Sequence, residues 1–65
     1  MTIDQFLAAA HVHSVKGGAD PTEMPLNGLR EALIAKRADL AMVQARSHVA
    51  RVQINAIDRA LARQP

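Results

Sequence analysis

The stretch LREALIAKRADLAMVQARSHVARVQINAIDRALAR, residues 29–63, decides the fold class predicted for this chain of 65 residues. It contains neither glycine nor proline, and the residues that dominate it (alanine, leucine, arginine and glutamine) favour helices. The sequence therefore predicts one long helix over residues 27–63, stopped by Pro65 and about 54 Å long at the helical rise per residue. A helix of this length is typical of a coiled coil or an extended assembly.

Apolar residues recur along this stretch at heptad spacing. With Leu26 at position a, the a and d positions hold Leu26, Leu29, Leu33, Leu40, Val43, Ala50, Ile54, Ile57 and Leu61, with breaks at Lys36 and Ser47. Positions that a two-stranded coil leaves in water are also apolar or small: Ile34, Ala38, Ala41, Met42, Ala45, Val49, Val52 and Ala56. A helix that is apolar on two opposite faces is normally buried on several sides, so contacts on at least two faces are predicted.

Self-association is the simplest way to cover so large an apolar surface. The side chains predicted to form the oligomer interface are Leu29, Leu33, Leu40, Met42, Val43, Val49, Val52, Ile54, Ile57 and Leu61. The expected partners are further copies of the chain, a larger protein assembly, or both.

A shorter helix is predicted over residues 2–15. Thr2 and Gln5 have the spacing of a capping box, and Gly17 and Gly18 follow the last helical positions. Residues 16–26 form a linker rich in glycine and proline. The predicted fold class is therefore all-α: a single small domain over residues 1–65, in which a short N-terminal helix, a linker and one long C-terminal helix form a helical hairpin packed in an oligomer.

The composition argues against an enzyme. Phe6 is the sole aromatic residue and there is no cysteine, although aromatic side chains usually supply much of the wall of a ligand pocket. His11 and His13 are two residues apart, so on a helix they point in different directions and do not bind one metal together. No nucleophile motif or phosphate-binding loop is present. We therefore expect no catalytic, cofactor-binding or metal-binding residues, and no cofactor.

The net charge of +2 is small, and the chain contains no run of basic residues. Nucleic acid is therefore not the favoured partner, although Arg30, Arg37 and Arg51 along one heptad edge leave phosphate contact open. The uncharged stretch from Gln5 to Val15 is too short to span a bilayer and lacks the features of a signal peptide. We expect no membrane span and no signal peptide, which leaves the cytoplasm or export by a dedicated apparatus.

Asp20-Pro21 followed by Glu23, and the tail VARVQINAIDRAL over residues 49–61, resemble the needle and inner-rod subunits of bacterial type III secretion systems. The tail combines a basic residue, an acidic residue and paired aliphatic residues, as the needle family does near its C-terminus. The resemblance implies a helical hairpin that polymerises, with a C-terminal helix that lines or supports a conduit. It also implies protein secretion without a signal peptide.

The lead hypothesis is thus a structural subunit that assembles through its long helix, with a needle or rod component of a secretion apparatus as its narrower form. One alternative is a small dimeric regulatory or adaptor module that binds nucleic acid or a larger protein. Another is an accessory subunit whose long helix docks on a larger partner.

Overall fold

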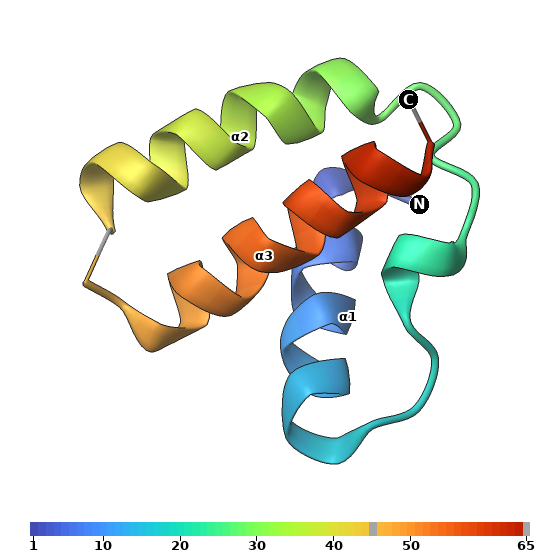
Figure 1. The fold of residues 1–65 in the computed structure, drawn as a ribbon, viewed down its shortest axis with the longest axis horizontal. Coiled ribbons are helices and arrows are strands. Elements are labelled where there is room, and N and C mark those ends of the chain that lie inside the picture. The colour runs from blue at the N-terminus through green and yellow to red at the C-terminus, as the bar shows by residue number, and fades with distance from the viewer. Residues whose placement is uncertain (45, 65) are drawn as a thin grey trace.

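All regular structure in the described residues, 1–44 and 46–64, is helical in the computed structural model. The elements are α1 (Ile3–Lys16), the short 3-10 helix η1 (Pro21–Glu23), α2 (Arg30–Val43) and α3 (His48–Arg63) (Figure 1). This confirms the predicted all-α class. Ala45, inside the predicted long helix, and Pro65, predicted to end it, lie outside the described residues.

The prediction of one continuous helix over residues 27–63 is wrong. Helix α2 ends at Val43, α3 begins at His48, and the two helices pack against each other (Figure 1). Ser47 has an extended backbone (φ −73°, ψ 131°), and its hydroxyl accepts a hydrogen bond from the Ala50 amide at 3.3 Å. Serine in this conformation is a good N-cap, so it starts a new helix where the heptad pattern predicted continuity.

The second helix also begins later than predicted. Asn27 and Gly28 have positive φ angles of 50° and 84°, which a right-handed helix does not allow, so α2 starts at Arg30. Pro21, Thr22 and Leu26 of the preceding segment are buried. Much of the predicted linker is therefore part of the packed structure.

Helix α1 starts at the predicted capping box. The Thr2 amide donates to Gln5 Oε1 at 2.8 Å, and the Gln5 amide donates to Thr2 Oγ1 at 3.1 Å. The helix ends at Lys16, followed by Gly17 with a φ of 77°. Phe6, Leu7 and Ala10 are its buried residues, and the helix packs on α3.

The core lies where α3 meets the other elements, because α3 contacts α1, η1 and α2. Leu33 and Ile57 are fully buried, and alanines on α3 allow the neighbouring elements to approach closely. The buried apolar residues are Phe6, Leu7, Ala10, Leu26, Leu33, Leu40, Ala50, Ala56, Ile57 and Ala60. A single chain encloses this core, and packing in an oligomer stays a prediction.

Proline at position 48 tests the break between α2 and α3. His48 is the first residue of α3, where proline fits the backbone and removes no intrahelical hydrogen bond. Ser47 already has the extended conformation that a residue before proline prefers. We expect His48→Pro to keep the helix content and thermal midpoint of the native chain in circular dichroism.

Asn55→Pro is the matched control, since Asn55 is exposed but lies inside α3. Proline there should destabilise the fold by about 3 kcal/mol or more. An equal loss of stability in the two variants would show that residue 48 lies inside a helix. It would contradict the interruption between α2 and α3.

Candidate functional site

The side chains predicted to form an oligomer interface have different surroundings in the folded chain. Leu33, Leu40 and Ile57 are buried in the core, Leu29, Ile54 and Leu61 pack against it, and Val52 is half-buried. Met42, Val43 and Val49 are exposed, by 78%, 75% and 39%. For Met42, Val43 and Val49, contact with another molecule stays a prediction. The other side chains are at least partly buried within the chain.

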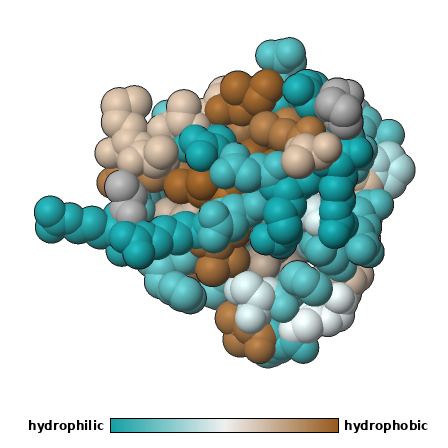
Figure 2. All heavy atoms as spheres, viewed as in Figure 1, coloured by the Kyte–Doolittle hydropathy of each residue, from teal (hydrophilic) through white to brown (hydrophobic). Residues whose placement is uncertain are grey.

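The outward side of α2 is apolar along most of its length. We define the α2 surface as the exposed residues Ile34, Ala35, Ala38, Ala41 and Met42. At 3.6 residues per turn, Ala35, Ala38 and Met42 lie opposite the buried Leu33 and Leu40. Figure 2 shows apolar atoms over α2, along the upper part of the molecule. This helix therefore has one apolar side in the core and another in water.

Four residues of the α2 surface were missed by the predicted interface: Ile34, Ala35, Ala38 and Ala41. Their signal is present in the sequence, because they occupy heptad positions that a simple coiled coil fills with polar residues. The prediction gave more weight to the leucine and isoleucine seam, which the chain uses for its own core.

Lys36 and Asp39 of α2 carry opposite charges and have no partner among the described residues. Lys36 is half-buried and Asp39 is exposed, and both line a shallow hollow of about 170 Å³ with Leu40, Val43 and Gln44. Within the described ranges, neither charged side chain forms an ion pair or hydrogen bond. Both groups are therefore available to a second molecule.

Arg37 of α2 has a partner on α3. Arg37 Nε donates to Asp58 Oδ1 at 2.6 Å and Arg37 Nη2 donates to Asp58 Oδ2 at 3.2 Å, which joins α2 to α3. These hydrogen bonds to Asp58 raise the pKa of the Arg37 guanidinium. Both side chains are more than 40% exposed, so the pair orients the two helices more than it stabilises them.

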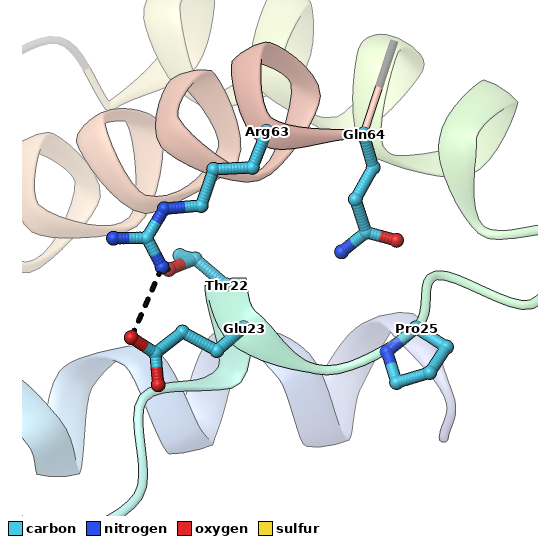
Figure 3. A pocket seen from close by; sticks show the side chains of 5 residues that line it. All are labelled: Thr22, Glu23, Pro25, Arg63 and Gln64. Atoms are coloured by element: carbon cyan, nitrogen blue, oxygen red, sulfur yellow. Dashed lines mark hydrogen bonds and ion pairs between the residues drawn. The ribbon is translucent and has the colours of Figure 1, made fainter.

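A larger hollow, about 390 Å³, lies between the segment around η1 and the end of α3 (Figure 3). Its lining residues are Thr22, Glu23, Pro25, Arg63 and Gln64. Arg63 Nη1 lies 3.3 Å from Glu23 Oε1 and donates to Thr22 Oγ1 at 3.2 Å. The charged groups of this hollow therefore neutralise each other.

The Gln64 side chain attaches the end of α3 to the segment before α2. Its Nε2 donates to the Met24 carbonyl at 2.6 Å, and its Oε1 accepts from the Leu26 amide at 3.1 Å. Arg30 Nη1 donates to the Gln64 carbonyl at 3.0 Å. With its polar groups bonded inside the chain, this region holds the fold together rather than presenting free groups to a ligand.

The two histidines of α1 have different surroundings. His13 Nδ1 lies 3.1 Å from the Gly18 carbonyl and His13 Nε2 lies 3.9 Å from Asp20 Oδ2, which closes the turn after α1. His11 Nδ1 is buried and has no hydrogen-bond partner among residues 1–44 and 46–64. In the same part of the chain, no group of three or more histidine, aspartate or glutamate side chains is placed to hold a metal ion.

Comparison of the chain with protein families, curated proteins and solved structures finds no match. Of the helices that the structure describes, none has the length and apolarity required to cross a bilayer. What bears on function is the surface chemistry of α2 and its flanks.

Asp20 provides a test of the contacts between α1 and η1. Its Oδ1 accepts a hydrogen bond from the Thr22 amide at 3.0 Å. That bond lowers the pKa of Asp20, partial burial opposes the shift, and the nearby Arg59 and, when it is protonated, His13 add to it. The ionised carboxylate is therefore favoured in the folded chain.

We expect Asp20→Asn to be less stable than the native chain near neutral pH. Because the folded-state pKa lies below the unfolded value of about 3.9, this difference is fully present above that value. It should then shrink as the pH falls through the folded-state pKa. Urea unfolding of dilute protein at a series of pH values measures it, with Asp39→Asn as the control for loss of one charge. If the stability difference between Asp20→Asn and the native chain did not change with pH, the ionised Asp20 carboxylate would not be the stabilising group.

Proposed function

We propose that the protein is a small, non-enzymatic structural subunit that functions by self-association through the α2 surface. The observation that carries the proposal is an exposed apolar surface on a helix whose other side already covers the core. Ile34 and Met42 are 44% and 78% exposed, and three exposed alanines lie between or beside them. Removing such a surface from water is favourable, and contiguous apolar patches of this kind mark interaction sites.

The shape of the α2 surface favours a helix as the bound element. Ala35, Ala38 and Ala41 have the smallest apolar side chains that carry a Cβ atom, so a second helix can approach to about 8 Å between axes. Ile34 and Met42 lie towards the two ends of the alanine stretch and supply larger side chains for contact. A second copy of the same helix meets these requirements without any further partner.

Nucleic acid is not part of the proposal. Arg37 and Arg63 are paired with Asp58 and Glu23, so two of the six arginines are already neutralised. The α2 surface itself is flanked by Asp39 on the side where Lys36 lies. The sequence also contains no run of basic residues of the kind that favours contact with a phosphate backbone.

A narrower proposal follows from the resemblance to type III secretion needle and inner-rod subunits. In a needle-like polymer, α2 and α3 would join into one long helix, and Leu33, Leu40 and Ile57 would become available for contacts between copies. Residues 44–47 contain no glycine or proline, so their types are compatible with a helix. The His48→Pro substitution distinguishes the two forms: it should leave association of the compact chain intact and abolish any polymer that needs the joined helix.

Replacing Met42 with glutamate tests self-association. We expect the native mass in sedimentation equilibrium to rise with concentration between the micromolar and millimolar ranges. Met42→Glu should keep the chain monomeric, because pairing would bury an unpaired carboxylate at the α2 surface. Circular dichroism should show an unchanged fold, since Met42 is 78% exposed.

Val15→Glu is the matched control, because Val15 is 66% exposed on α1, outside the α2 surface. It should associate as the native chain does. A native chain that stays monomeric throughout, or equal effects of the two substitutions, would contradict the proposed function.

A further inference from the structure

Asn27 and Gly28 form the turn that leads into α2. The Leu29 amide donates to the Leu26 carbonyl at 3.0 Å across this turn, and the two central residues have φ angles of 50° and 84°. Asparagine followed by glycine is the pair that such a turn favours, because both residues tolerate positive φ angles. Asn27 and Gly28 are also exposed, so water reaches the turn.

The Gly28 amide is free to react with the side chain that precedes it. Among the described residues, neither this amide nor the Asn27 side chain has a hydrogen-bond partner. Apart from its chain neighbours, no described atom lies within 4 Å of the place that a Cβ atom on Gly28 would occupy. The peptide unit between the two residues can therefore rotate without a clash, which brings the Gly28 nitrogen to the Asn27 Cγ atom.

Asn55, the other asparagine of the chain, has different surroundings. Its side chain is exposed, but the next residue, Ala56, is 1% exposed and lies inside α3. Because the Ala56 amide is held by the hydrogen-bond pattern of the helix, it reaches the Asn55 side chain only if the helix unwinds. The fold thus exposes one asparagine to attack by the following amide and protects the other.

We propose that Asn27 is a site of spontaneous deamidation, with water as the reactant. The Gly28 nitrogen loses its proton to base and attacks Cγ of Asn27. The bond from Cγ to Nδ2 breaks, ammonia leaves with a proton taken from water, and a five-membered succinimide ring remains. The reaction changes no oxidation state, and the proposal is independent of self-association.

Water then opens the succinimide ring. Its hydroxyl group adds to one of the two ring carbonyl carbons, the bond from that carbon to the Gly28 nitrogen breaks, and the nitrogen regains a proton. Opening at Cγ gives aspartate with a normal main chain. Opening at the main-chain carbonyl gives isoaspartate, in which the main chain passes through the side-chain carbons and is one methylene group longer.

The isoaspartate product should weaken the attachment of α3. The added methylene group lies between Leu26 and Leu29, whose hydrogen bond closes the turn. Leu26 is buried, and its amide donates to Gln64 Oε1 at 3.1 Å. The longer main chain disturbs both contacts, so the isoaspartyl form should have a lower thermal midpoint than Asn27→Asp, which has the same charge and a normal main chain. Equal midpoints of the two forms would overturn this consequence.

Incubation of the native chain at mildly alkaline pH tests the site, because base produces the reactive form of the Gly28 nitrogen. Mass spectrometry of its peptides should find conversion of amide to acid at Asn27 at least about tenfold faster than at Asn55. Asn27→Gly is the matched variant, since glycine keeps the turn and has no side-chain amide. Ion exchange should show that it accumulates acidic protein at least about tenfold more slowly than the native chain.

Faster conversion at Asn27 together with the loss of the acidic form in Asn27→Gly supports the site. Equal rates at Asn27 and Asn55, or acidic protein that accumulates as fast in Asn27→Gly as in the native chain, would overturn it. Circular dichroism checks that the variant keeps the native fold.

Discussion

The packing of α3 against α2 is the interaction on which the rest of the structure depends. Leu33 and Ile57 are fully buried, which requires the chain to turn back after α2 instead of continuing as one rod. Once α3 lies against α2, the Arg37–Asp58 pair fixes their relative orientation. The contacts of Gln64 then attach the end of α3 to the segment that leads into α2. Helix α1 and η1 complete the core on the other sides of α3.

The parts of the fold that depend on local signals could be predicted from the sequence. The capping box of Thr2 and Gln5 acts between residues three apart, so it is visible without knowledge of the fold. The break before α3 is different, because residues 44–47 are compatible with a helix and the heptad pattern runs through them. Ser47 is the residue in this stretch that indicates a break. A serine caps a helix only where the chain turns, so its presence alone does not predict the turn. That turn is decided by burial of Leu33 and Ile57, which are far apart in sequence.

The α2 surface likewise has some features that the local sequence predicts and others that depend on long-range packing. The heptad pattern predicted two apolar sides along one continuous helix, whereas the folded chain divides these residues between α2 and α3. Helix α1 packs on α3, so Ala56 is buried and Val52 is half-buried, whereas the corresponding side of α2 stays in water. This outcome depends on where a short helix docks, which no periodicity within α2 or α3 specifies. Which charges of α2 are paired also appears only when the fold is known: among the described residues, Arg37 has a partner on α3 and Lys36 has none.

The turn between α2 and α3 is the central feature of this account, and a distance between two spin labels tests it most directly. Labels attached through Ala32→Cys and Ala62→Cys report on the first turn of α2 and the last turn of α3, at exposed positions. In the folded chain these turns are close, as the 3.0 Å hydrogen bond from Arg30 to the Gln64 carbonyl shows. Pulsed dipolar spectroscopy of dilute protein should therefore give a distance well below the 28 Å longest extent of the Cα atoms. A single population near about 45 Å, the length of a continuous helix between the two positions, would contradict the account.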